Sequence, residues 1–156
     1  MIIVLENIRS GWNVGSIFRT CDAVGSDLIL VGYTPRPNPK TDKVIHKTAI
    51  GAENSVKWEY FSHSQEVFQK YNDFKHFAID INTISENLFD FLDENKDLDL
   101  TKTILWFGNE IRGLSEETMT TCEKTLHLPM KGFKESLNIA TSVSAANYLF
   151  LYKNLK

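Results

Sequence analysis

Short apolar runs alternate with amphipathic stretches along most of the chain. Three of the runs are continuous and rich in Ile, Val, Leu and Phe, which is typical of buried strands; they cover residues 2–5, 28–31 and 103–107. Weaker runs predict further strands over residues 56–60, 77–81 and 126–128. Because strands alternate with helical stretches, the pattern predicts an α/β fold with a mostly parallel sheet that carries helices on both faces.

Apolar residues spaced three and four apart predict two long helices, over residues 13–24 and 137–152. In the first, Ile17, Cys21 and Val24 share one face, and Gly25 ends the helix. Shorter helices are predicted from residue 41 or 42 to Gly51, over 64–71, over 84–92, and after Ser115. Ser115 is a suitable N-cap because Glu116 and Glu117 follow it in the first turn.

Length and composition predict one globular domain over residues 1–156, since hydrophobic residues make up 42% and charged residues 24%. No apolar run approaches the roughly 20 residues of a membrane span, and the N-terminus lacks the features of a secretion signal. Two cysteines, Cys21 and Cys122, are too few for a disulfide scaffold or a cysteine zinc site. We therefore expect a cytoplasmic protein. The histidines stand singly, so no metal site is predicted; they are His46, His63, His76 and His127.

The net charge of −3 is unevenly distributed along the chain. Residues 58–101 carry a balance of −7, whereas residues 1–57 and 102–156 carry +2 each. The two ends can therefore present a basic face to a nucleic acid. The alternative is that the acidic residues 58–101 form only the solvated surface of helices and that the charge pattern has no bearing on a partner. Charge alone does not decide between these two interpretations.

Three loops beside predicted strands carry unusual chemistry, and the first is the stretch NVGSIFRT at residues 13–20. Asn13 is a good N-cap, and Gly15 allows close approach of another backbone or a ligand. The Arg19 guanidinium offers forked donors suited to a phosphate or carboxylate. The alternative is an ordinary capped helix with an exposed arginine.

The second loop is FGNEIRGLS at residues 107–115, where Gly108 and Gly113 flank Glu110 directly after a strand. Glycines at the carboxyl end of a strand let backbone groups face a ligand. The spacing fits neither a dinucleotide-binding fingerprint nor a P-loop. A plain turn between strand and helix is the alternative.

The third loop is LPMKGFKESLN at residues 128–138. Lys131 and Lys134 make it basic, and Asn138 has a side chain that both donates and accepts hydrogen bonds. Ser136 is either the cap of the last helix or a pocket residue. Polar side chains around a glycine-shaped loop favour a ligand pocket.

In this order, the three loops resemble the three motifs of the SpoU-type (TrmH-like) RNA 2′-O-methyltransferases of the SPOUT class. The first motif, N-x-G-x-I-x-R, is matched by Asn13, Gly15, Ile17 and Arg19. The second, G-x-E-x-x-G-L, is matched by Gly108, Glu110, Gly113 and Leu114. The third, P-M-x-G followed by S-L-N, is matched by Pro129, Met130, Gly132, Ser136, Leu137 and Asn138. Three motifs in order at these separations are more specific than any one alone.

The resemblance implies a SPOUT fold with a C-terminal trefoil knot, and a homodimer with active sites at or near its interface. It implies S-adenosylmethionine as the methyl donor. The residues expected around this cofactor are Ile79, Gly108, Leu128, Met130, Ser136 and Leu137. The expected catalytic residues are Arg19, which orients the phosphate and the 2′-hydroxyl, with Glu110, Asn138 and Asn13 positioning the site.

A compact dimer without a separate RNA-binding domain most resembles the family members that act on tRNA, so we expect tRNA in preference to ribosomal RNA. Neither a membrane nor DNA is expected as a partner. Basic residues on loops near the motifs are expected to contact RNA phosphates: Arg9, Arg36, Lys40, Lys43, Lys47, Lys131 and Lys134. The alternatives are a ribosomal RNA methyltransferase, a catalytically silent RNA-binding partner subunit, and a different nucleotide-binding module.

Overall fold

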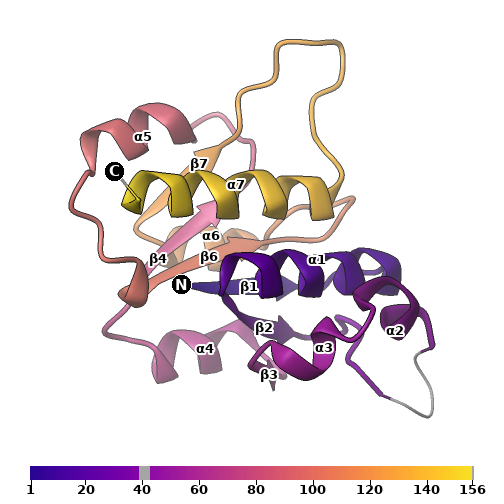
Figure 1. Ribbon diagram of the computed structural model, residues 1–156. Coiled ribbons are helices and arrows are strands. Elements are labelled where there is room, and N and C mark those ends of the chain that lie inside the picture. The colour runs from indigo at the N-terminus through magenta and orange to yellow at the C-terminus, as the bar shows by residue number, and fades with distance from the viewer. Residues whose placement is uncertain (39–42, 156) are drawn as a thin grey trace.

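Seven strands form one sheet in the computed structural model, which describes residues 1–38 and 43–155 (Figure 1). The strand order is β3-β2-β1-β6-β4-β7-β5, and every pair of neighbours is parallel. The strands are β1 (Ile2–Glu6), β2 (Asp27–Val31), β3 (Trp58–Phe61), β4 (Lys75–Ile79), β5 (Glu86–Asn87), β6 (Thr103–Phe107) and β7 (Lys124–His127). The predicted α/β fold with a parallel sheet is confirmed.

Helices connect the strands and cover both faces of the sheet (Figure 1). They are α1 (Gly11–Val24), α2 (Lys43–Ala49), α3 (Ala52–Ser55), α4 (Ser64–Lys70), α5 (Leu88–Glu94), α6 (Glu116–Thr121) and α7 (Ile139–Asn154), with a 3₁₀ turn at Leu100–Lys102. None of these described helices is long and apolar enough to cross a membrane.

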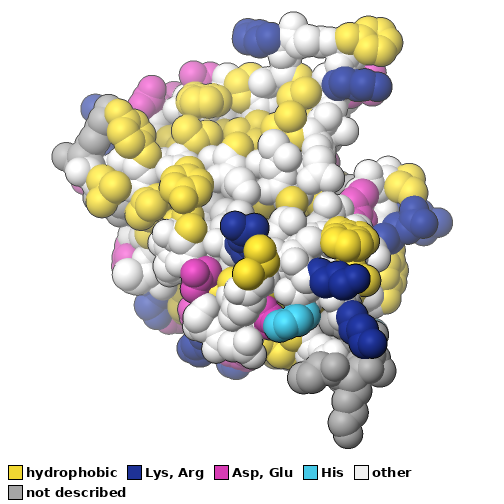
Figure 2. All heavy atoms as spheres, turned by 45° about the vertical axis from the view of Figure 1, so that its right-hand side comes forward, with side chains coloured by type: hydrophobic (Ala, Val, Ile, Leu, Met, Phe, Trp, Pro, Cys, Tyr) yellow, Lys and Arg dark blue, Asp and Glu magenta, His cyan; other side chains and the backbone are white. Residues whose placement is uncertain are grey.

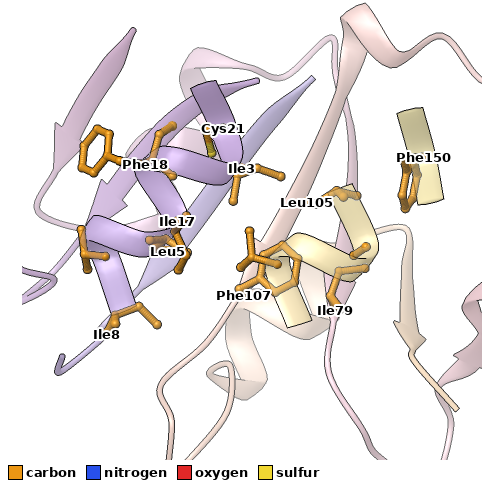
Figure 3. Close-up of a cluster of buried hydrophobic side chains, with 14 of the residues drawn as sticks. Ile3, Leu5, Ile8, Ile17, Phe18, Cys21, Ile79, Leu105, Phe107 and Phe150 are labelled. Carbon is orange, nitrogen blue, oxygen red and sulfur yellow. The ribbon is translucent and has the colours of Figure 1, made fainter. Parts of the chain in front are cut away.

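Alternation along the strands divides the core into two layers, because successive side chains point to opposite faces of the sheet. Ile3 and Leu5 pack with α1, α2, α3, α5 and α7 on one face. Ile2 and Val4 pack with α4 and α6 on the other. Figure 3 shows the first layer, where side chains of α1 lie over those of β1. The two helices that carry the first and third motifs, α1 and α7, therefore lie on the same face of the sheet.

Both long helices begin at residues other than the predicted ones. Helix α1 begins at Gly11, and its N-cap is Ser10, whose Oγ accepts from the Asn13 N–H at 3.3 Å. Helix α7 begins at Ile139 instead of 137, with Asn138 as its N-cap in place of Ser136. The Asn138 Oδ1 accepts from the Ala140 N–H at 2.9 Å, which satisfies one of the free donors of the first turn.

Several shorter elements also differ from their predicted bounds. The strand predicted over 56–60 is β3, which begins at Trp58 because Val56 is the C-cap of α3. The predicted helix over 84–92 is strand β5 followed by α5, because the Asn87 side chain caps the helix by accepting from the Phe89 N–H at 2.9 Å. The helix predicted to end at Gly51 is divided into α2 and α3. Strands β4 and β7 each begin two residues before the predicted start, where their parallel partners continue. The predicted caps Thr41 and Asp42 lie outside the described residues.

The second layer holds a buried histidine between aromatic rings. The Trp106 Nε1–H donates to the His76 Nδ1 at 3.0 Å, so the other ring nitrogen carries the proton and donates to the Tyr71 carbonyl at 2.9 Å. Burial lowers the pKa of His76 from its ordinary value of 6.5, although the hydrogen bond to Tyr71 opposes the shift. The folded protein therefore favours the neutral imidazole.

This histidine predicts a loss of stability in mild acid. The unfolded chain takes up a proton at this histidine near pH 6.5, whereas the folded chain takes it up only at lower pH. The contribution of the neutral His76 to the free energy of unfolding is therefore complete above pH 6.5 and is lost as the pH falls below that value. His76→Gln keeps both hydrogen bonds without the titration. Urea unfolding at about pH 7.5 and about pH 5.5 should show a smaller difference in this variant than in the wild type. The exposed His63→Gln is the control, and an equal difference in all three proteins would contradict the prediction.

Candidate functional site

The carboxyl ends of three neighbouring strands, β6, β4 and β7, open onto a cavity of about 480 Å³, called here the strand-end cavity. Ligands in parallel α/β sheets bind at this edge. The loop between β7 and α7 projects from the same end of the fold (Figure 1). The lining comprises Ile79, Asp80, Ile81, Phe107–Gly113, His127, Leu128, Met130, Glu135–Ile139 and Ser142.

The second motif forms a closed turn on one side of this cavity. Asn109 and Gly113 exchange two backbone hydrogen bonds, at 3.0 and 2.9 Å. The turn brings the backbone of Gly113 and Leu114 so close to Gly108 that a Cβ at Gly108 would lie 2.2 Å from both. Gly113 itself has a φ of +69°, a conformation that other residues rarely adopt. Both glycines of the motif are therefore required by the backbone of the turn.

Asp80, directly after β4, fastens this turn to the sheet. Its Oδ2 accepts from the Leu114 N–H at 2.8 Å, and its Oδ1 accepts from the Ile81 N–H at 2.7 Å. A side chain at Gly113 would collide with this carboxylate, since its Cβ would lie 2.4 Å from the Asp80 Oδ2. The motif analysis missed Asp80, whose only signal in the sequence is its position after a strand.

A second missed carboxylate, Glu6, joins β1 to the start of α6. It is buried and accepts from the Ser115 N–H at 3.1 Å, from the Thr118 hydroxyl at 2.7 Å and from the Ser64 hydroxyl. Ser115 is the N-cap of α6, as predicted. Glu6 therefore holds the far end of the second motif in place without lining the cavity.

Glu110 connects the second motif to the first. Its carboxylate accepts from the backbone N–H groups of Arg9 and Ser10, at 3.0 and 3.1 Å, and from the Asn13 side-chain amide at 3.1 Å. Partial burial alone would raise the pKa of Glu110, but these hydrogen bonds hold it below its usual range. The group is thus an ionised carboxylate at the N-terminus of α1, where the helix dipole favours negative charge.

Asn13 extends the connection to the third motif. Its Oδ1 accepts from the Asn138 side-chain amide at 3.2 Å, while its own amide donates to Glu110. The three motifs, which are some 125 residues apart at their extremes, are therefore joined side chain to side chain at the mouth of the cavity. The sequence predicted these three residues as one site, and the structure brings all three together.

Arg19, in contrast, does not line the strand-end cavity of its own chain. It is exposed on α1, seven residues after the exposed Trp12, so both side chains lie on the outer face of the helix. Among the described residues, Arg19 thus lies apart from Glu110, Asn13 and Asn138, and its predicted catalytic role stays a prediction. The helical repeat is the reason, because Asn13 and Arg19 lie on different sides of α1.

Arg112 is the one arginine or lysine among the described residues that line the cavity. It is exposed and follows Glu110 by two positions in the second motif. Three carboxylates share the lining, those of Asp80, Glu110 and Glu135. The cavity therefore offers anionic groups to a cationic ligand and a single guanidinium to an anionic one.

All six residues predicted around the cofactor line this cavity; they are Ile79, Gly108, Leu128, Met130, Ser136 and Leu137. They end or follow three strands, β4, β6 and β7, and they bring apolar and polar groups to the same cavity. That mixture is typical of small-molecule sites. Their contacts with a cofactor stay a prediction.

The residues predicted to contact RNA are dispersed over two ends of the fold. The Arg36 guanidinium lies 3.9 Å from the centre of the Tyr60 ring, and Lys43 begins α2, which also carries Lys47. Lys131 and Lys134 lie on the exposed loop after β7, and Arg9 precedes α1. Lys40 lies outside the described residues. Figure 2 shows Lys and Arg side chains gathered on the side of the fold that carries α1 and α2.

A parallel sheet with a small-molecule cavity at its strand ends is typical of ligand-binding α/β proteins. Here the cavity is built by the three motif loops. The chain matches the model of the SpoU rRNA Methylase family over residues 1–148. It is 32% identical to the tRNA (guanosine(18)-2′-O)-methyltransferase of Aquifex aeolicus, over 98% of this chain and 67% of that protein. The chain belongs to the SpoU (TrmH-like) family of RNA 2′-O-methyltransferases, and the predicted family is confirmed.

Solved structures agree with this assignment. The SpoU methyltransferase AviRb from Streptomyces viridochromogenes, in complex with the cofactor AdoMet, is 25% identical, with a TM-score of 0.82 over 100% of this chain and 58% of that one. A structure described as giving insights into the 2-OH methylation of C/U34 on tRNA is 26% identical, with a TM-score of 0.79 over 99% of this chain and 95% of that one.

Proposed function

We propose that this protein transfers a methyl group from S-adenosylmethionine to a ribose 2′-hydroxyl of tRNA. The observation that carries the proposal is the hydrogen-bonded series Glu110–Asn13–Asn138, which joins all three motifs at the mouth of the strand-end cavity. Asn138 also caps α7, and Glu110 also accepts from the backbone before α1. A silent RNA-binding subunit is therefore the rival interpretation, and the methylation assay below separates the two.

The chemistry of the cavity fits S-adenosylmethionine. Its volume of about 480 Å³ is within the usual range of small-molecule sites. Apolar side chains of Ile79, Leu128 and Met130 suit the adenine, and the carboxylates in the lining suit a cationic sulfonium and ammonium. When bound, the cofactor supplies an electrophilic methyl group. The protein has to hold the ribose in line with it and exclude water.

The polar residues at the mouth have two different tasks. Glu110 is fully engaged with α1, so it acts as a positioning residue that sets where Asn13 and Asn138 lie. Arg19 offers the forked guanidinium that orients the substrate phosphate and the 2′-hydroxyl. Because arginine stays protonated, it stabilises negative charge and does not accept the proton. The adjacent substrate phosphate is a suitable proton acceptor.

A two-fold homodimer explains how Arg19 can act in catalysis although it does not line the cavity of its own chain. Helix α7 and its C-cap expose large apolar side chains: Tyr148, Tyr152 and the capping Leu155, at 50%, 55% and 75% exposure. A second copy of this chain would cover this face and α1 beside it, in an isologous contact. We propose that Arg19 then serves the cavity of the partner subunit, within the knotted fold that the family resemblance implies.

Two relatives support tRNA as the substrate. The Aquifex protein named above is a tRNA guanosine-18 methyltransferase, and a chain of nearly the same length is described with methylation of tRNA at C/U34. Ribosomal RNA is the second candidate, since the family description names rRNA. The position that is methylated stays open between these precedents.

Transfer of labelled methyl groups tests the function directly. The protein is incubated with labelled S-adenosylmethionine and with size-separated tRNA and ribosomal RNA from cells that lack it. We expect label in the tRNA fraction, recovered as an alkali-resistant dinucleotide, which identifies 2′-O-methylation. Label confined to ribosomal RNA would reassign the substrate. No label despite measurable cofactor binding would support the silent subunit.

Salt dependence tests the predicted RNA contacts. Each phosphate contact is expected to contribute about −0.7 to −0.9 to the slope of log K against log salt concentration. The double variant Lys131→Ala/Lys134→Ala should therefore flatten the slope by roughly 1.5, as measured by filter binding of tRNA. The exposed Lys75 and Lys96, at the start of β4 and between α5 and β6, provide the matched control Lys75→Ala/Lys96→Ala. Equal slopes in both double variants would remove the loop after β7 from the RNA interface.

A further inference from the structure

A second cavity, separate from the strand-end cavity, lies between α2, α3 and β3. Its volume is about 400 Å³. The described residues that line it are Pro37, Asn38, Lys43, Ile45, His46, Glu53, Asn54 and Trp58. None of these residues belongs to the three motifs, and nothing in the methyl-transfer chemistry uses them. We call it the α2–β3 cavity.

The most unusual group in this cavity is the carboxylate of Glu53. Its side chain is only 8% exposed. The Oε1 pairs with the His46 Nδ1 at 2.5 Å, whereas the buried Oε2 has no hydrogen-bond partner among the described residues. A carboxylate oxygen without a donor among the described residues keeps lone pairs that a ligand can engage. Burial alone would raise the pKa of Glu53, but hydrogen bonds with the His46 side chain and with the backbone N–H groups of Glu53 and Gly51 hold it below its usual range, so the group is an ionised acceptor.

The remaining lining supplies what a flat, polar, aromatic ligand needs. Trp58 is half-buried and offers aromatic surface, held edge-on by Phe18 at 6.3 Å between ring centres. Asn54 adds a side-chain amide, and Lys43 adds a cation. Arg36, one residue before the lining begins, stacks on Tyr60. Arg36 and Lys43, which the sequence predicted as RNA-phosphate contacts, thus lie beside a cavity whose Glu53 carboxylate accepts hydrogen bonds.

We propose that the α2–β3 cavity binds an unpaired guanine base of the RNA substrate, with Glu53 accepting from its Watson–Crick edge. The proposal rests on the function proposed above, in that RNA is the substrate, and it adds a recognition site away from the reacting ribose. Single-stranded bases are commonly recognised by stacking on aromatic rings and hydrogen bonding along that edge.

Guanine is the base that fits a carboxylate. It carries a ring N–H and an exocyclic amino group side by side, and a carboxylate is an acceptor only. Adenine and cytosine each offer an amino group next to a ring acceptor, which a carboxylate would repel, and uracil offers no amino group. Lys43 would hold a flanking phosphate, a contact that positions the strand without reading its sequence.

Binding of short RNAs without S-adenosylmethionine tests the proposal. The probes are fluorescent single-stranded uridine nonamers with a central guanosine, inosine or adenosine, measured by anisotropy. Inosine keeps the ring N–H but lacks the amino group. The wild type should bind the guanosine probe about tenfold more tightly than the inosine probe, since a hydrogen bond to a charged group is lost. Glu53→Gln, which preserves the shape of the side chain, should reduce this preference to about twofold or less.

Two further variants separate this site from general electrostatics. Glu123→Gln removes the same charge at an exposed position outside the cavity and should keep the wild-type preference. Lys43→Ala should weaken all three probes by similar factors and leave their ratio unchanged. Thermal unfolding of each variant confirms that it is folded.

Equal binding of guanosine and inosine by the wild type would overturn the proposal. So would an unchanged preference in Glu53→Gln, or an equal loss in Glu123→Gln. The assay needs neither cofactor nor methyl transfer. A negative binding result therefore contradicts only the guanine site. A negative methylation result contradicts only the proposed function, because the guanine preference can still be measured without methyl transfer.

Discussion

Replacing Arg19 with alanine will slow methyl transfer by about 10²–10³-fold, the usual range for losing one positioned donor that stabilises developing negative charge. The affinity for S-adenosylmethionine will stay within a few-fold, because Arg19 is proposed to contact the phosphate and 2′-hydroxyl of the RNA and not the cofactor. Stability will change little, since Arg19 is exposed on α1. Arg19→Lys will remain impaired, because lysine keeps the charge and loses the planar fork. Single-turnover kinetics and cofactor titration measure both effects.

A mixture of two inactive variants tests whether Arg19 acts across the dimer. The second variant is Asn138→Asp, which keeps a capping oxygen for α7 but removes the amide that donates to Asn13. If each site takes Arg19 from one subunit and Asn138 from the other, every mixed dimer has one intact site. Refolding the two variants together at equal amounts should then restore about one quarter of the wild-type rate, because half of the dimers are mixed.

Other outcomes of this experiment are equally informative. If the mixture is as inactive as either variant alone, Arg19 and Asn138 work within one chain and α1 must rearrange to bring them together. If Arg19→Ala retains wild-type activity, Arg19 has no part in the reaction. A monomer at working concentrations, measured by sedimentation, would contradict the dimer itself.

Gly108→Ala will cause a large loss of stability. A Cβ at this position would lie 2.2 Å from the backbone of Gly113 and Leu114, and the backbone cannot move aside as a flexible side chain would. We expect a loss of about 3 kcal/mol in the free energy of unfolding, which lowers the melting temperature by roughly 6–12 °C. Cofactor binding will fall by at least about tenfold, because the turn forms one wall of the strand-end cavity.

Gly132→Ala, in the third motif, is the matched control. A Cβ there would meet nothing within 4 Å, and its φ is not positive. The substitution should change the free energy of unfolding by less than about 0.5 kcal/mol. Calorimetry and cofactor titration compare the two variants. Similar losses in both would show that the motif glycines act through flexibility and not through the close approach at Gly108.

The buried strands and the three loops were predictable because each depends on local composition. The strand predicted over residues 103–107 has the same bounds as β6 in the structure. An apolar segment of this length followed by glycine has few other interpretations. Helix caps were harder to predict. Ser115 was identified, but Asn13 was predicted as a cap where Ser10 serves. For Ser136 a cap and a pocket residue were both open, and Asn138 caps α7 while Ser136 lines the cavity. Several residues close together are able to cap a helix, and distant contacts, such as Glu110 with Asn13, decide which one does.

The sequence alone determined the alternation of the fold, the positions of its three motif loops and the family, because strand burial and motif spacing are properties of neighbouring residues. Only the tertiary structure decided which groups meet. It placed Asp80 and Glu6 as anchors of the second motif, left Arg19 outside its own cavity, and brought Glu53 to a second one. The physical reason is that hydrogen bonds to buried carboxylates depend on strand order and helix packing. Residues that are some 30 to 125 positions apart along the chain carry no local sign of such contacts.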